Sequence, residues 1–79
     1  MNIYTVLNLV DRAPDGHISV ERAFHSPVEA FDYITSVFPS NKSDTCYNEF
    51  KFMLEAEDYC ICFDRFDSDY GYKVESVFL

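Results

Sequence analysis

The pattern of apolar positions in the first third of the chain predicts two paired β-strands. Residues 3–10 carry β-branched and aromatic side chains on both faces, which is typical of a central strand covered on both sides. Residues 17–25 alternate between apolar and polar positions, and Val20 and Phe24 are expected on the same face. The Pro-Asp-Gly sequence at 14–16 supplies the backbone angles of a tight turn, so we predict a β-hairpin.

A helix is predicted over residues 27–38. Ser26 can cap its first turn, Pro27 suits the first helical position, and Glu29 completes a capping box. The apolar side chains that follow recur at helical spacing, at Ala30, Phe31, Ile34, Val37 and Phe38. Because Pro39 ends this pattern, we expect one helix with a single apolar face packed on the sheet.

Residues 48–57 fit two patterns. Phe50, Phe52 and Leu54 alternate with polar or charged neighbours, as in a strand, whereas Tyr47, Phe50 and Leu54 fit the spacing of a helix. A strand would place Phe52 inside, and a helix would place it opposite the apolar stripe. On this ground the strand is preferred and the helix is kept as the alternative.

The remaining sequence predicts two strands, at 59–66 and 72–79, joined by a turn at 67–71. Tyr59, Ile61 and Phe63 fall on one face of the first of them. All 79 residues are expected to form a single α+β domain. It would have an antiparallel sheet of four or five strands with one helix on a face, in the order β-β-α-β-β-β.

Composition supports a compact core without cross-links, since 48% of the residues are hydrophobic and 18% are aromatic. An odd number of cysteines, at positions 46, 60 and 62, argues against a disulfide framework and favours reduced thiols. The N-terminus lacks the basic region of a signal peptide, and no apolar run approaches the ~20 residues of a membrane span. The expected location is therefore the cytoplasm, with no membrane contact.

Catalytic and metal-binding motifs are not found. His17 and His25 are eight residues apart, about 26 Å along a strand, which is too far to share a metal ion. The two glycines form no phosphate-binding loop, and residues 67–71 resemble the start of a calcium loop only with glycine one position early. We expect no enzymatic activity, no cofactor and no bound metal.

Charge changes the picture most. The chain has 14 acidic and 6 basic residues, and its net charge of −8 opposes direct binding to nucleic acid or anionic membranes. The charge would favour basic surfaces, or it would serve solubility alone. It also favours a monomer. Residues 55–69 concentrate the acids against a single Arg65, and on the preferred strand the carboxylates of Glu55 and Glu57 would lie about 6.6 Å apart.

The candidate partner-binding residues are these acids and the tyrosines beside them, since tyrosine is common at interface hot spots. They are Glu55, Glu57, Asp58, Asp64, Asp67, Asp69, Tyr59, Tyr70 and Tyr72. Closely spaced carboxylates on a stiff sheet would imitate the charges of a nucleic-acid backbone. A groove lined with lysine and arginine would accept them.

In length, acidity and lack of enzyme motifs the whole chain resembles the small phage-encoded anti-CRISPR inhibitors, in particular the acidic DNA mimics. The resemblance implies a basic nucleic-acid-binding protein as partner, such as a Cas subunit of a CRISPR surveillance complex, which the inhibitor would block from target DNA. The alternative is a small adaptor or homodimerising module that pairs through a sheet edge. Its basis is the apolar strand at 72–79, which would stand at such an edge.

Overall fold

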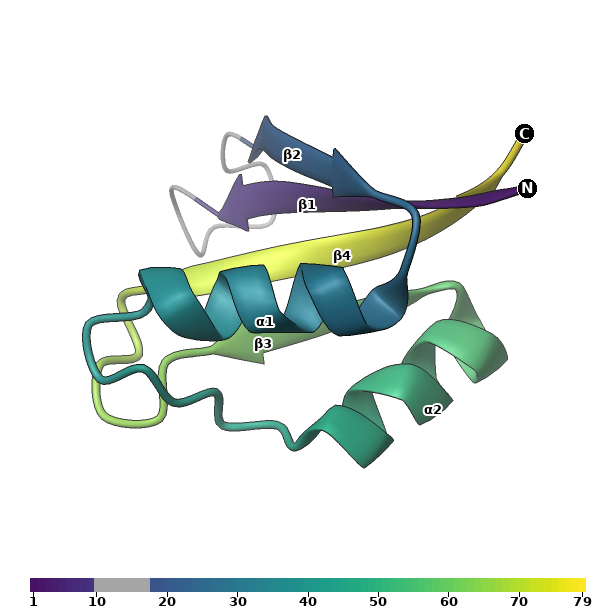
Figure 1. The fold of residues 1–79 in the computed structure, drawn as a ribbon. Helices are drawn as coiled ribbons and strands as arrows, with labels where there is room; N and C mark the ends of the chain where they lie inside the picture. Colours follow the sequence, from purple (N-terminus) through teal and green to yellow (C-terminus); the bar gives the residue numbers. More distant parts are fainter. Residues whose placement is uncertain (10–17) are drawn as a thin grey trace.

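The computed structural model describes residues 1–9 and 18–79, with only the backbone described at 18 and 19 (Figure 1). Val10, His17 and the turn expected at 14–16 lie outside these residues. The described residues form two helices and four strands with their connecting loops. In chain order they are β1 (Asn2–Leu9), β2 (Ile18–Phe24), α1 (Pro27–Val37), α2 (Tyr47–Glu57), β3 (Tyr59–Phe63) and β4 (Gly71–Phe78).

The four strands form one antiparallel sheet in the order β2-β1-β4-β3. The predicted α+β class and the β1–β2 pairing are confirmed, whereas the single helix and the fifth strand are wrong. Strand β4 lies between β1 and β3, so the expectation that the last strand forms an edge is also wrong. A strand that runs to the chain end can still be central, because sequence order does not fix spatial order.

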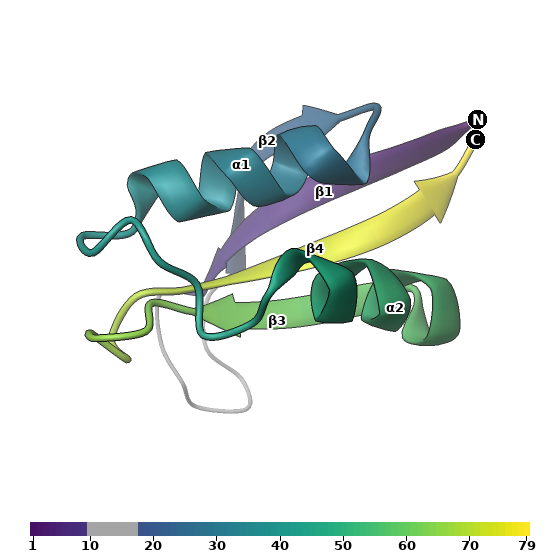
Figure 2. The same cartoon turned by 60° about the horizontal axis from the view of Figure 1, so that its bottom comes forward.

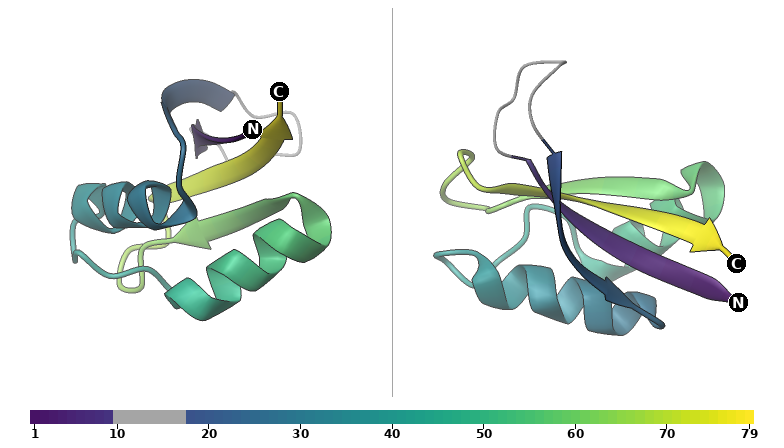
Figure 3. Two further views of the ribbon diagram at one scale, coloured as in Figure 1. Left: turned by 45° about the vertical axis from the view of Figure 1, so that its right-hand side comes forward. Right: turned by 90° about the horizontal axis from the view of Figure 1, so that it is seen from above.

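Both helices pack on the same face of the sheet (Figures 2 and 3). Strand β1 lies between β2 and β4, so the expectation of a central strand is confirmed. Within the described residues no helix lies on the opposite face, where Leu7 of β1 is nevertheless only 9% exposed. The core therefore lies between one sheet face and two helices. Its largest fully buried side chains are Phe38, Phe50, Ile34, Val6, Val74 and Cys62.

Helix α1 forms as its sequence predicts. The Ser26 Oγ accepts a hydrogen bond from the Val28 backbone N–H at 3.2 Å, and Pro27 stands at the start of the helix. Ala30 and Ile34 are completely buried against the sheet, one helical turn apart. Burial of a side chain such as Ile34 contributes about 1.5–3 kcal/mol, so this face anchors the helix.

The segment predicted as a strand at 48–57 is the helix α2. Phe50 and Leu54 are buried, while Phe52 is 66% exposed, so the pattern at helical spacing prevails over the alternation. The glutamates, lysine, methionine, leucine and alanine of this segment are strong helix formers. The helix leaves the ring of Phe52 exposed, whereas the strand was preferred on the assumption that this ring is buried.

Strand β2 contains an irregularity that reverses its faces part-way along. Arg22 pairs with Val6 and Val20 pairs with Leu7, so one extra residue, Glu21, stands between the two pairs. Such a bulge moves the residues before it to the other side of the sheet. Val20 consequently lies on the face without helices and Phe24 on the helical face, and the prediction that they share a face is wrong.

Candidate functional site

Three acidic residues surround the C-terminal end of α2. Glu55 and Glu57 stand in its last turn, Asp58 is its C-cap, and the turn contains no basic residue. The carbonyl end of a helix carries a partial negative charge, and anionic side chains there destabilise by about 0.3–1 kcal/mol each. These acids therefore stand where they oppose folding and strengthen a negative potential. We call Glu55, Glu57 and Asp58 the α2 acidic end.

Asp58 is held rigidly. Its backbone is in the left-handed region (φ 64°, ψ 7°), which aspartate tolerates better than most residues. Its N–H donates to the Leu54 carbonyl at 3.1 Å and its own carbonyl accepts from the Ser76 N–H at 2.8 Å. The second bond joins the end of α2 to β4, so the backbone that carries the three carboxylates is fixed relative to the sheet.

A groove of about 380 Å³ opens beside the α2 acidic end. Glu55 and Asp58 line it, together with Lys51 one turn earlier on the helix. Tyr4 and Phe78 contribute aromatic rings from two adjacent strands. The remaining lining residues are Asn2, Pro27, Leu54 and Ser76. A groove with carboxylates and aromatic rings on its walls suits a cationic side chain, which pairs with the former and stacks on the latter.

No ion pair neutralises these carboxylates within the described part of the chain. The pair found there joins the Lys73 Nζ to Glu75 Oε1 at 2.9 Å, on the face of the sheet away from the helices. Lys51 lines the same groove as Glu55, but their charged groups are not within ion-pairing distance. The α2 acidic end is therefore available to an external cation.

The continuous row of carboxylates expected over 55–69 does not form. On a helix, positions 55 and 57 point about 200° apart, so Glu55 and Glu57 do not share a face as they would on a strand. Asp67 and Asp69 stand in the turn after β3, and the five residues of β3 separate them from the α2 acidic end by about 17 Å. The acids form two groups, one at each end of β3.

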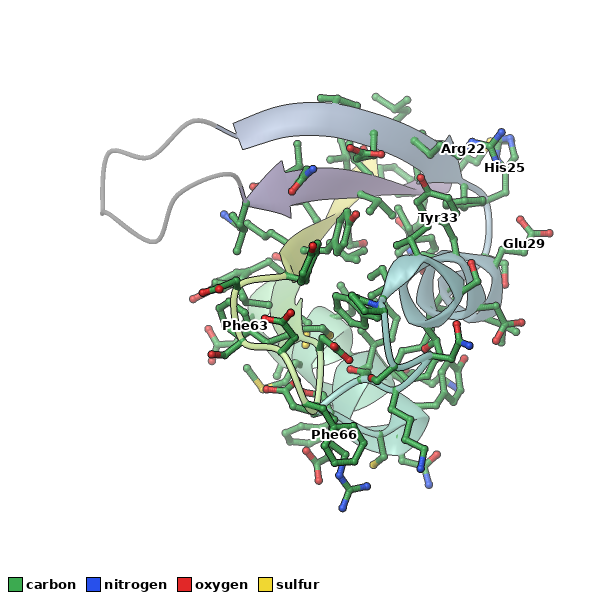
Figure 4. All side chains as sticks on the ribbon, turned by 90° about the vertical axis from the view of Figure 1, so that its left-hand side faces the viewer. Arg22, His25, Glu29, Tyr33, Phe63 and Phe66 are labelled. Carbon is green, nitrogen blue, oxygen red and sulfur yellow. The ribbon has the colours of Figure 1, made fainter. Side chains whose placement is uncertain are left out.

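The second group has basic neighbours. The exposed ring of Phe66 lies 5.7 Å from the Lys42 Nζ and 5.9 Å from the Arg65 Cζ. Figure 4 shows Phe66 projecting from its loop, on the far side of the molecule from Arg22 and Tyr33. Asp67 and Asp69 are linked to each other through the Asp69 N–H and the Asp67 Oδ1 at 3.2 Å. The two cations weaken the negative potential here relative to the α2 acidic end.

Two of the candidate partner-binding residues are inside the protein. Asp64 is 3% exposed, and its Oδ1 accepts a hydrogen bond from the Ser40 hydroxyl. Tyr72 is 9% exposed, packs against Phe38 at 5.5 Å between ring centroids, and has its pKa raised by burial. Neither side chain is available for contact, because Tyr72 lies on the inner face of β4 and Asp64, directly after β3, is buried where its backbone bridges to Ser43. Tyr59 and Tyr70 are exposed.

Strand β3 carries two buried thiols in contact with each other. The Cys60 and Cys62 Sγ atoms lie 3.8 Å apart, on the helical face of β3, with both side chains buried. The contact with Cys60 and burial raise the pKa of Cys62 well above its usual range, while the same contact lowers the pKa of Cys60. No cluster of three or more histidine, cysteine or acidic side chains capable of holding a metal occurs among residues 1–9 and 18–79.

A polar network joins β2 to α1 on the helical side of the sheet. Glu21 accepts hydrogen bonds from the Asn8 amide at 3.1 Å and from the Tyr33 hydroxyl at 3.2 Å. The Arg22 guanidinium lies over the Tyr33 ring, 5.5 Å from its centroid, and Figure 4 shows the two side by side. Burial raises the pKa of Tyr33, and the bond to Glu21 raises it further. The network uses the extra residue of the β2 bulge as its acceptor.

Sequence reasoning missed several residues of the groove. Lys51 was not a candidate because it would lie about 13 Å from Glu55 on the predicted strand, and Tyr4 and Phe78 were not candidates because they come from the two ends of the chain. The helical alternative would have placed Lys51 and Glu55 one turn apart on one face. The exposed ring of Phe52 on α2 was missed for the same reason.

Comparisons with protein-family models, with curated proteins and with solved structures were made for the whole chain. None of the three found a match. In the described part of the chain, neither helix has the length and apolar character needed to cross a membrane.

Proposed function

We propose that the protein is a non-enzymatic inhibitor that binds the basic, nucleic-acid-binding surface of another protein through the α2 acidic end. The partner class is a defence complex of the CRISPR type in the host cytoplasm, and occupancy of its basic surface would exclude target DNA. The protein would thus act as an anti-CRISPR that imitates DNA by charge.

The observation that carries this proposal is the placement of Glu55, Glu57 and Asp58 at the negative end of a helix, with no ion pair to any of them among the described residues. A charge needed only for solubility could stand anywhere on the surface, and most places would not destabilise the helix. A cationic partner relieves that unfavourable placement on binding. The groove supports the proposal further, since its aromatic walls add apolar contact to the charge attraction.

The experiment compares two variants with the same net charge. The test variant, Glu55→Gln, Glu57→Gln and Asp58→Asn, removes the α2 acidic end and changes the net charge from −8 to −5. Asparagine keeps the left-handed backbone at position 58 accessible. The control variant, Glu29→Gln, Asp32→Asn and Glu49→Gln, also has a net charge of −5, but its changes are at exposed positions in the first or second turn of a helix.

Affinity for a purified CRISPR surveillance complex is measured at roughly 50 and 200 mM salt, with and without target duplex DNA as competitor. We expect the test variant to bind at least tenfold more weakly, a loss of about 1.4 kcal/mol, and the control to bind much as the parent does. Binding should weaken with salt and compete with the duplex. Equal losses in both variants, or binding insensitive to salt, would refute the assignment to the α2 acidic end.

Stability gives an independent measurement on the same variants. Removing acids from a helix C-terminus should stabilise the test variant by about 0.3–1 kcal/mol per residue at low salt, whereas the control loses favourable charges from helix N-termini. A test variant that is more stable yet binds less well would separate a binding role from a structural one.

A further inference from the structure

The sheet face that the helices leave bare is largely apolar. Three of its aliphatic side chains are well exposed: Val20 at 67%, Ile61 at 42% and Val77 at 39%. All lie opposite the helices, as their pairings with Leu7, Lys73 and Ile3 show. We call this surface the open face. Its described residues are Ile3, Thr5, Leu7, Leu9, Val20, Ala23, Tyr59, Ile61, Phe63, Gly71, Lys73, Glu75 and Val77.

The charges on the open face cancel. Lys73 and Glu75 stand two residues apart on β4 and form the ion pair at 2.9 Å. The Lys73 Nζ also lies 4.9 Å from the centroid of the Tyr59 ring. In a molecule with a net charge of −8, this is a neutral surface with one cation and one anion near its centre. Val20 on β2 and Ile61 on β3 stand at the two edges of the sheet, with Leu7 and Lys73 in the row between them, so apolar side chains flank the ion pair on both sides.

We propose that the open face binds the open face of a second copy of this chain, to give a two-fold dimer with the helices outside. A two-fold interface must be self-complementary. If residue i of one copy contacts residue j of the other, then residue j of the first copy contacts residue i of the second. If two copies of β4 cross antiparallel, Lys73 of each copy faces Glu75 of the other. The one ion pair then becomes a network of four alternating charges, surrounded by apolar side chains.

The high net charge favours a monomer, but the acidic side chains on the helices oppose this arrangement only weakly. Packed sheets lie about 10 Å apart, and a helix layer stands about 10 Å behind each sheet. The carboxylates on the helices of the two copies are then about 30 Å apart. At physiological salt the screening length is about 8 Å, so their repulsion is largely removed.

The size of the face sets the expected strength. The strands have 8, 7, 5 and 8 residues, and at about 4.8 Å between strands and about 3.3 Å per residue they give about 440 Å² per copy. The total of about 900 Å² is below the standard size of specific interfaces, in the range where association is weak and reversible. We therefore expect a dimer that forms in the micromolar range.

Sedimentation equilibrium or light scattering over roughly 5 to 500 µM protein tests the proposal. The mass should rise from 9.2 kDa toward twice that value, and added salt should not dissociate the dimer. Ile61→Gln should weaken association at least tenfold without changing any charge. Lys73→Glu alone, or Glu75→Lys alone, should give monomers at all these concentrations.

The decisive sample is an equimolar mixture of the Lys73→Glu and Glu75→Lys variants, which should form a heterodimer because one face is then acidic and the other basic. Lys51→Glu makes the same charge change as Lys73→Glu but lies on α2, and it should leave the dimer intact. A parent protein that stays monomeric throughout, or variants that do not associate on mixing, would overturn the proposal. In that case the open face would have to bind a different protein.

These measurements involve neither the α2 acidic end nor its proposed partner. A monomer that still binds the surveillance complex refutes only the dimer. A dimer that does not bind the complex refutes only the proposed function.

Discussion

Replacing Gly71 by alanine tests how closely β3 and β4 approach at the end of the sheet. Gly71 pairs with Phe63, and the phenyl ring lies across the position that a β-carbon would occupy. An added Cβ would stand 2.5 Å from the Phe63 Cε1 and 2.6 Å from its Cδ1. Ordinary carbon contacts are about 3.5–4.0 Å, so the ring must move by about 1 Å or turn away.

The ring cannot move with its backbone. Asp44 holds Phe63 on the outer side of β3, because its Oδ1 accepts from the Phe63 N–H at 3.0 Å and its own N–H donates to the Phe63 carbonyl at 2.8 Å. Relief must therefore come from rotation of the side chain toward solvent, with loss of its burial. Overpacking of this kind costs about 1–3 kcal/mol, so we expect Gly71→Ala to lower the free energy of unfolding by that amount.

In a protein without the Phe63 ring, Gly71→Ala should raise the free energy of unfolding instead of lowering it. In a Phe63→Ala background the added methyl meets no obstacle, and alanine in a strand is favoured over glycine by about 0.5–1 kcal/mol. A double-mutant cycle should consequently show a coupling energy of about 1.5–4 kcal/mol between positions 63 and 71.

Urea denaturation of the four proteins, at low micromolar concentration, measures this coupling, and melting temperatures should shift by about 4–8 °C per kcal/mol. If the effects of Gly71→Ala and Phe63→Ala add within about 0.5 kcal/mol, the ring does not occupy the space over Gly71 and the reasoning fails.

Two further predictions concern thiols and pH. Because Cys46 is exposed while Cys60 and Cys62 are buried, one thiol per native chain should react rapidly with a disulfide reagent and all three after denaturation; rapid reaction of two or three would contradict the described packing. Tyr33 has a raised pKa in the folded state, so its contribution to stability is present below pH ~10 and is lost as pH rises through the folded pKa. Tyr33→Phe should therefore lose less stability than the parent between neutral pH and pH ~12 in urea titrations, and an identical alkaline decline would contradict this.

How far the sequence predicted the fold depended on whether local patterns agreed with one another. Around α1 the cap at Ser26, the proline after it and the apolar spacing all favoured a helix, and the helix is there. At 48–57 two patterns competed, and the strand was chosen for Phe52, a residue that the structure leaves exposed. A single-sequence pattern cannot say which apolar residue will be left outside, because that depends on what the rest of the chain offers to cover it.

The candidate site was affected by the same uncertainty. The concentration of acids after residue 54 is visible in the sequence, and three of them meet at the end of α2. The predicted arrangement of these carboxylates was wrong because residues 48–57 form a helix and not the predicted strand. Asp64 was expected on the surface, although it is buried and accepts a hydrogen bond from the Ser40 hydroxyl. Nor could a local pattern reveal the groove, whose walls come from both ends of the chain.

The two ends of the chain are bound to each other. The Met1 amino group donates to the Leu79 carbonyl at 3.0 Å, and the Leu79 N–H donates to the Met1 carbonyl at 2.8 Å. Both residues are directly next to lining residues of the groove, Met1 before Asn2 and Leu79 after Phe78. An affinity tag or fluorescent protein fused at either end would therefore emerge beside the groove and could obstruct it. A short peptide joining Leu79 to Met1, with the chain reopened in a distant loop, would keep the fold and leave that entrance unobstructed.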